Sequence, residues 1–92
     1  MSEHKTRLFK SEVPQTRMET ANFLRELADK VATGTVVLRR SGEEWEVVIP
    51  EHVVLEVQLD KKSKSGKGVK HSLEIEIEWY EGGAGAGPVE LG

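Results

Sequence analysis

The stretch "SLEIEIEWYE", residues 72–81, alternates aliphatic and acidic residues until it ends at two aromatic residues. Successive side chains of a β-strand point to opposite faces, so this pattern predicts a strand with one apolar face and one acidic face. The apolar face is expected to carry Leu73, Ile75, Ile77 and Trp79, and the acidic face Glu74, Glu76 and Glu78.

The chain upstream predicts one helix and several further strands. "KTRLFKSEV", residues 5–13, is expected to be a short strand that ends at Pro14. Residues 16–34 have helical periodicity, with a capping-box spacing of Thr16 and Glu19 at the start and a glycine at the end. The period then changes from 3.6 to 2, which predicts strands in residues 35–40, 44–50 and 52–60.

These elements indicate an α+β fold in which one amphipathic helix packs on one face of an antiparallel sheet. The expected element order is β-α-β-β-β-β, because a single helix can cover one face of a sheet and leave the other in water. Residues 1–81 are expected to form a single domain, and the glycine-rich residues 82–92 a flexible tail. The expected core includes Leu24, Ala28, Val31, Val47, Leu55, Val57, Ile75 and Ile77.

With these segments in place, the chain resembles the amphi-Trp domain family, small prokaryotic domains named for an amphipathic C-terminal strand that ends in tryptophan. The resemblance covers about residues 7–80, and the tail after Glu81 lies outside it. It implies an α+β fold but supplies no activity and no functional residues. It is carried, in the expected order, by "LFKSE", "ANFLRELADKVATG", "IPEHVVLEV" and "HSLEIEIEW".

Size and composition narrow the range of functions. A chain of 92 residues with 37% hydrophobic content has a thin core and little stability to spare for a catalytic cavity, so no enzyme and no catalytic or cofactor-binding residue is expected. No metal site is expected either, because His4, His52 and His71 lie on separate segments without ligand spacing. The lack of cysteine, of a secretory signal and of a membrane-spanning run predicts a cytoplasmic protein without membrane association.

Residues 61–70, "KKSKSGKGVK", are expected to form a long polar loop between two strands. The loop carries five lysines and no acidic residue, which allows contacts with phosphates. No aromatic residue alternates with the lysines for base stacking, and the net charge of −3 opposes nucleic-acid binding. A lysine-rich loop that keeps a small sheet soluble is the preferred interpretation, and nucleic-acid or polyanion binding through residues 61–70 is the alternative.

The acidic face carries the candidate partner-binding residues Glu56, Glu74, Glu76 and Glu78. If the strands form a hairpin, Glu56 lies near Glu76, and like charges opposite each other destabilise a sheet. Arg39 and the loop lysines could compensate this repulsion internally, and a basic partner or a cation could do so externally. The leading hypothesis is a non-catalytic interaction module that binds an unknown protein partner or self-associates, through the acidic face or an unpaired strand edge.

The two tryptophans lie in phase with aliphatic residues, Trp45 with Val47 and Trp79 with Ile77. Aromatic residues in this position commonly supply buried area, so both are expected in the core. The alternative is that Trp79 emerges at the end of the sheet and anchors a partner.

Overall fold

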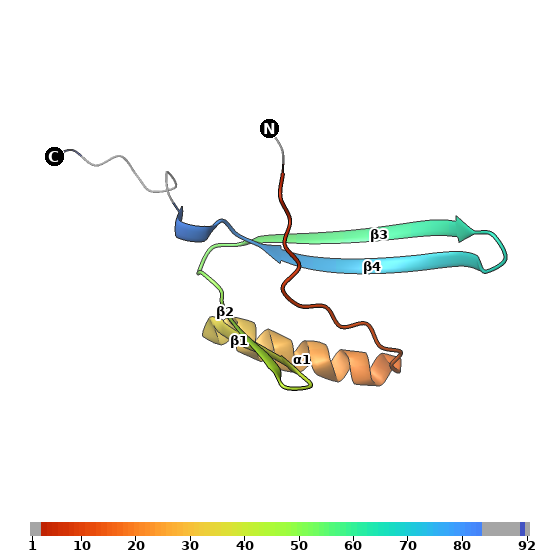
Figure 1. Ribbon diagram of the computed structural model, residues 1–92, viewed down its shortest axis with the longest axis horizontal. Coiled ribbons are helices and arrows are strands. Elements are labelled where there is room, and N and C mark those ends of the chain that lie inside the picture. The colour runs from red at the N-terminus through yellow and green to blue at the C-terminus, as the bar shows by residue number, and fades with distance from the viewer. Residues whose placement is uncertain (1–2, 84–90, 92) are drawn as a thin grey trace. The chain divides into compact units, whose positions relative to one another are not determined.

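A computed structural model describes residues 3–83 and Leu91. It contains one α-helix and two antiparallel two-stranded sheets, which confirms the α+β class (Figure 1). Contacts divide the chain into two units, Met1–Ile49 and Pro50–Gly92, and each is described by itself. The elements are α1 (Arg17–Thr33), β1 (Thr35–Arg40), β2 (Glu43–Val48), β3 (Val54–Lys64), β4 (Gly68–Glu78) and a short 3-10 helix, η1 (Glu81–Gly83).

The helix α1 begins and ends where its sequence signals predict. The Thr16 hydroxyl accepts a hydrogen bond from the Glu19 amide at 3.0 Å, and the Glu19 carboxylate accepts one from the Thr16 amide at 3.3 Å. This capping box satisfies two amides that have no partner within the helix. Gly34 ends the helix with φ of 91°, a left-handed conformation in which glycine carries no steric penalty.

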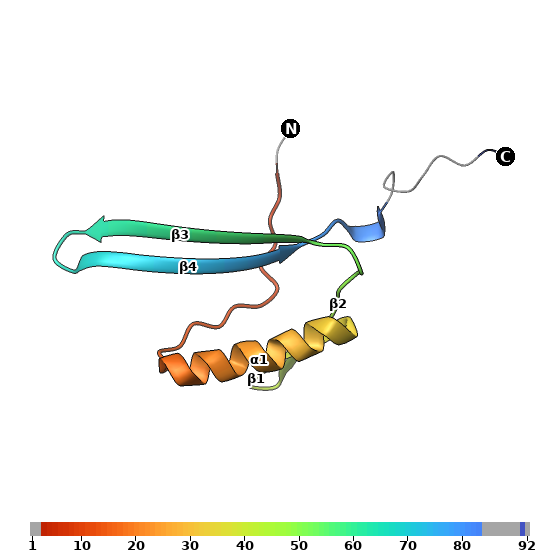
Figure 2. The ribbon, with the colours of Figure 1, turned by 180° about the vertical axis from the view of Figure 1, so that it is seen from behind.

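The first unit combines α1 with the β1–β2 hairpin. Ser41 and Gly42 close this hairpin with φ of 47° and 85°, the positive values that a tight two-residue turn requires. The helix packs against β1 (Figure 2). Val36 of β1, 7% exposed, is the one buried hydrophobic residue in the described part of the chain. The other hydrophobic residues of this unit that are partly covered are Phe9, Ala21, Leu27, Val31, Leu38, Val47 and Ile49.

The prediction of an N-terminal strand is wrong, because the described residues before α1 form no strand, and the order is α-β-β-β-β. This segment is held by the side chain of Arg40 rather than by a ladder of backbone hydrogen bonds. The Arg40 guanidinium lies 4.9 Å from the centroid of the Phe9 ring and donates a hydrogen bond to the Lys10 carbonyl. With Leu8 and Phe9 as its central apolar residues, the segment lacks the alternation that sets a strand register.

The second unit is built on the long β3–β4 hairpin, with pairs from Val54↔Glu78 to Lys64↔Gly68. The predicted loop of residues 61–70 is wrong in its extent, because only residues 65–67 form the turn. The Lys67 amide closes this turn with a hydrogen bond of 3.1 Å to the Lys64 carbonyl. A segment too polar to pack can still be a strand, since its backbone is paired and its side chains stay in water.

The predicted core is also wrong. None of its eight residues is buried, and three of them in the β3–β4 hairpin, Leu55, Val57 and Ile75, are more than half exposed. Trp45 and Trp79 are 39% and 37% exposed, so neither is a core residue. Alternation identifies the apolar face of a strand correctly, but it does not say what covers that face. A two-stranded sheet cannot bury its own apolar face without a further element packed on it.

The predicted flexible tail, residues 82–92, lies mostly outside the described residues. Within the described part of the chain, no helix has the length and apolar character needed to cross a membrane.

Candidate functional site: the polar face of the β3–β4 hairpin

The β3–β4 hairpin presents one face made mostly of polar side chains, here called the polar face; Val54, which pairs with Glu78, is its aliphatic member. Alternation along both strands and the antiparallel register place the four glutamates predicted from the sequence on this face. Three of the loop lysines share it, and the fourth and fifth do not: Lys61 points to the opposite side and Lys67 lies in the turn. The polar face comprises Glu56, Gln58, Asp60, Lys62, Lys64, Lys70, Ser72, Glu74, Glu76 and Glu78.

The charges on this face are separated along the strands. Four glutamates, Glu56, Glu74, Glu76 and Glu78, gather where β3 begins and β4 ends, and we call them the acidic end. Lys62, Lys64 and Lys70 lie beside the turn and form the lysine end. Six residues of strand separate Glu56 from Lys62, about 20 Å, which exceeds the distance of about 8–10 Å over which exposed charges interact in physiological salt. Asp60 and Glu74 lie between these two positions and border the same hollow as Lys62 and Lys70.

The acidic end brings like charges into direct opposition. Glu56 pairs with Glu76 across the ladder, and carboxylate oxygens of Glu56, Glu76 and Glu78 lie within 4.8 Å of one another. The Gln58 amide donates a hydrogen bond to the Glu56 carboxylate. Opposed like charges destabilise a sheet, so this arrangement costs the hairpin stability unless something neutralises it.

The pKa values of two carboxyl groups at the acidic end are shifted in opposite directions. The hydrogen bond from Gln58, followed by those from Glu78 and Glu76, holds the pKa of Glu56 below its ordinary value of 4.5. The hydrogen bond to Glu56, followed by the negative charge of Glu76, raises the pKa of Glu78 above 4.5. Of these two carboxyl groups, Glu78 therefore holds a proton more readily than Glu56, and a protonated Glu78 donates to the Glu56 carboxylate.

No ion pair between the acidic end and a lysine or arginine is found among the described residues. The ion pairs of the described residues are Lys10–Glu12, Arg39–Glu44 and Arg40–Glu43, and none involves the hairpin. Arg39, the predicted compensating residue, donates instead to Glu44 across the β1–β2 ladder at 3.0 Å. No described ion pair therefore neutralises the glutamates of the acidic end.

Three carboxylates so close together could also hold a divalent cation, because Ca²⁺ and Mg²⁺ prefer oxygen ligands. No metal site was expected from the spacing of the histidines, but a cation was one of the external groups expected to compensate the opposed Glu56 and Glu76.

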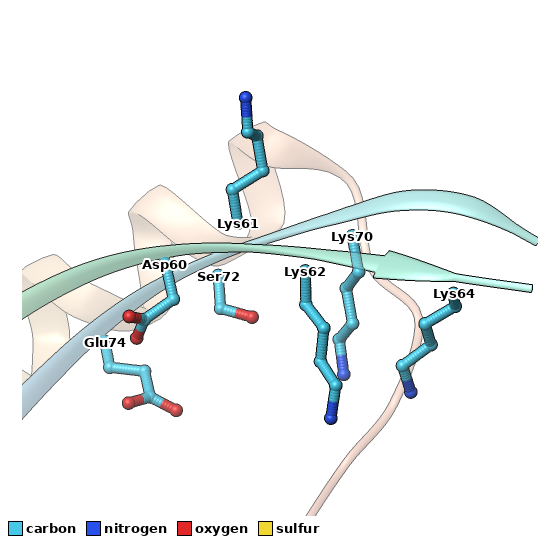
Figure 3. Close-up of a pocket in the computed structure, with 7 residues that line it drawn as sticks. All are labelled: Asp60, Lys61, Lys62, Lys64, Lys70, Ser72 and Glu74. Atoms are coloured by element: carbon cyan, nitrogen blue, oxygen red, sulfur yellow. The ribbon is translucent and has the colours of Figure 1, made fainter.

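At the lysine end, a shallow hollow of about 430 Å³ lies along the two strands. Lys62 pairs directly with Lys70 across the ladder, and Lys64 lies two residues further along β3. Their side chains extend to the same side of the hairpin as those of Asp60, Ser72 and Glu74, whereas Lys61 extends to the other (Figure 3). The lysines were expected to form one loop cluster. Because β3 extends to Lys64, successive side chains alternate between two faces, and the lysines are divided between them.

Comparison with known proteins places the chain in a family. The model of the Amphi-Trp domain matches residues 1–91. The chain belongs to the Amphi-Trp domain family. The match extends beyond residues 7–80, where the resemblance was seen, so the tail after Glu81 falls within the Amphi-Trp domain match. No curated protein and no solved structure matches this Amphi-Trp domain.

Proposed function

We propose that this protein is a non-catalytic interaction module whose acidic end binds a basic segment of a partner protein. The observation that carries the proposal is the opposition of Glu56 and Glu76, with Glu78 beside them and no ion pair to a cationic side chain among the described residues. A lysine or arginine of a partner would remove the repulsion on binding, and complementary charge would also direct its approach.

Other features of the chain support a binding role. The hollow at the lysine end and the hollow between α1 and β1, both lined by described residues, are open to solvent, whereas a catalytic pocket brings buried polar groups together and shifts their pKa values strongly. The hairpin also has two unpaired edges, at which an extended peptide could add a further strand. A cytoplasmic location, a single domain over residues 1–81 and a flexible tail at residues 82–92 remain predictions.

The proposal can be tested with a peptide of about ten residues rich in lysine and arginine, titrated into ¹⁵N-labelled protein. We expect amide shifts in residues 54–58 and 74–78, and an affinity that falls as salt is added. The double substitution Glu56→Gln and Glu76→Gln should weaken binding at least about tenfold, a difference of about 1.4 kcal/mol in binding free energy.

The matched control is Glu26→Gln with Glu46→Gln, which removes the same charge from exposed positions of the first unit. Equal affinity of the two double variants would show that binding follows net charge rather than the acidic end, and the proposed site would be wrong.

The second candidate function is binding of nucleic acid or another polyanion at the lysine end. The hollow bordered by Lys62, Lys64 and Lys70 favours it, because three ammonium groups on one face can contact successive phosphates. No aromatic side chain lines this hollow, so base stacking would be absent and binding weak.

A salt titration with single-stranded and duplex DNA separates the two functions. Binding that falls steeply with salt and is lost in Lys62→Gln with Lys70→Gln, but kept in Lys5→Gln with Lys30→Gln, would establish the second function.

A further inference from the structure

The hollow on the polar face of the β3–β4 hairpin is bordered by side chains of both charges. Lys62, Lys64 and Lys70 border it on the side of the turn, and Asp60 and Glu74 border it on the other side. These five side chains extend to the same side of the hairpin (Figure 3), and none of them belongs to an ion pair of the described residues. The charge of the face therefore changes sign between Asp60 and Lys62, two residues of strand or about 7 Å apart.

This change of sign decides which partners fit the whole polar face. A polyanion laid along the strands over Lys62 and Lys70 would bring negative charge close to Asp60 and, further along, to the acidic end. A uniformly basic segment that binds the acidic end and continues along the strands would reach the lysines. Like charges that face each other across an interface select against a partner. Only a partner whose own charge changes sign along its length meets opposite charge at both ends.

We propose that the polar face binds a partner segment with a basic block followed by an acidic block, the basic block on the acidic end and the acidic block on the lysine end. The proposal rests on the proposed function, to which it adds the lysine end and the direction in which the partner lies. From Glu56 to Lys64 the charged face is eight residues of strand long, about 27 Å, a length that an extended segment of about nine residues spans.

The two ends of the polar face contribute differently to binding. The acidic end has the stronger repulsion to relieve, because Glu56, Glu76 and Glu78 hold their carboxylate oxygens within 4.8 Å of one another. The lysine end adds exposed ion pairs, which are individually weak, so three lysines together should raise the affinity about fivefold to tenfold. The basic block thus supplies most of the affinity, and the acidic block supplies discrimination between basic partners.

The test measures the affinity of three peptides for the full chain by isothermal titration calorimetry. The first peptide carries a basic block and an acidic block of about four residues each, joined by a short serine spacer that gives it the length of the charged face. The second has serines in place of the acidic block, and the third has the composition of the first with alternating charges. We expect the first peptide to bind at least about fivefold tighter than either of the others. Net charge alone would favour the second, because the protein carries a charge of −3.

Two double variants of the hairpin locate the contribution of the acidic block. Lys62→Gln with Lys70→Gln removes two ammonium groups from the polar face. The matched control, Lys61→Gln with Lys67→Gln, removes the same charge from the same hairpin, because Lys61 extends to the other side and Lys67 lies in the turn. In the first variant, the first and second peptides should bind within about twofold of each other, and in the control the fivefold difference should remain.

A second measurement uses the wild-type protein and reports the direction of the bound segment. A nitroxide label at the free end of the acidic block should broaden the amide resonances of residues 61–64 and 68–72. The same label at the free end of the basic block should broaden those of residues 54–58 and 74–78. Equal broadening of both regions by either label would show a segment without a fixed direction and would overturn the proposal.

The remaining outcomes separate this proposal from the proposed function. If the first and second peptides bind equally and both shift the amides of the acidic end, the lysine end is not part of the site and only the present proposal is overturned. If no peptide binds, both are overturned. If single-stranded DNA binds tighter than the first peptide and is lost in Lys62→Gln with Lys70→Gln, the lysine end is a nucleic-acid site and the partner proposed here is wrong.

Discussion

Replacement of Arg40 by alanine should loosen the N-terminal segment and destabilise the first unit. The guanidinium lies 4.9 Å from the centroid of the Phe9 ring, donates to the Lys10 carbonyl and pairs with Glu43 at 3.1 Å. We assign about 0.5–1 kcal/mol to the cation–π contact, about 1 kcal/mol to the hydrogen bond and up to about 0.5 kcal/mol to the exposed ion pair. Arg40→Ala should therefore lower the free energy of unfolding by about 1.5–2.5 kcal/mol.

The neighbouring residue supplies the control. Arg39 has a single described partner, Glu44, and its side chain is 71% exposed compared with 47% for Arg40. Arg39→Ala should cost no more than about 0.5 kcal/mol. The assay is urea unfolding followed through backbone amide resonances of residues 17–48, which report on the first unit alone.

A double-mutant cycle of Arg40→Ala with Phe9→Leu isolates the cation–π contact and should give a coupling energy of about 0.5–1 kcal/mol. Faster amide exchange in residues 8–12 should accompany the loss of Arg40, since no strand ladder holds that segment. Equal effects of Arg39→Ala and Arg40→Ala, or a coupling energy near zero, would refute the assignment of Arg40 as the anchor.

Three further predictions concern the cap and the acidic end. Thr16→Ala removes the acceptor of the Glu19 amide and should cost about 1 kcal/mol in urea unfolding; an unchanged midpoint would contradict the capping box. Carboxyl ¹³C titrations should show Glu56 titrating below pH 4.5 and Glu78 above it; coincident midpoints would exclude the shared proton. By linkage, the raised pKa of Glu78 favours folding below pH 4.5, and this contribution is lost as the pH rises through its folded pKa. The lowered pKa of Glu56 favours folding above pH 4.5, and this contribution is lost as the pH falls through its folded pKa. Glu76→Lys should raise the urea midpoint by relieving the repulsion while weakening capture of the basic peptide; a lowered midpoint would show that the acidic end is already compensated.

Local signals in the sequence predicted the parts of the fold that depend on neighbouring residues. The helix start at Thr16 and its end at Gly34 follow from hydrogen bonds and conformations within a few residues, and both are confirmed. The turn at Ser41 and Gly42 likewise depends on the conformations of these two residues alone. The alternation of residues 72–81 likewise predicted β4 and the opposition of Glu56 and Glu76.

The predictions that are wrong depend on distant parts of the chain. Whether residues 5–13 join a sheet depends on an available edge, and whether Leu55 or Ile75 is buried depends on what covers the hairpin. Neither the available edge nor the covering surface can be read from the local sequence pattern. The extent of β3 was missed because the polarity of residues 61–64 was taken as evidence for a loop. A strand whose backbone is paired with its neighbour and whose two faces are exposed to water can nevertheless carry lysines.

The alternation that identifies the hairpin also makes its three possible binding surfaces separable by experiment. Because neighbouring residues of a strand point to opposite faces, Glu56→Lys should affect only a partner on the polar face, and Val57→Lys only a partner on the opposite, aliphatic face. A partner that adds to the strand edge would contact the backbone and respond to both substitutions to a similar, smaller extent, whereas proline at an outward-facing amide would abolish its binding. If binding of the basic peptide is lost in Glu56→Lys and kept in Val57→Lys, the peptide binds on the polar face. A partial loss of similar size in both variants would instead indicate the strand edge, and the acidic end would have to be abandoned as the binding site.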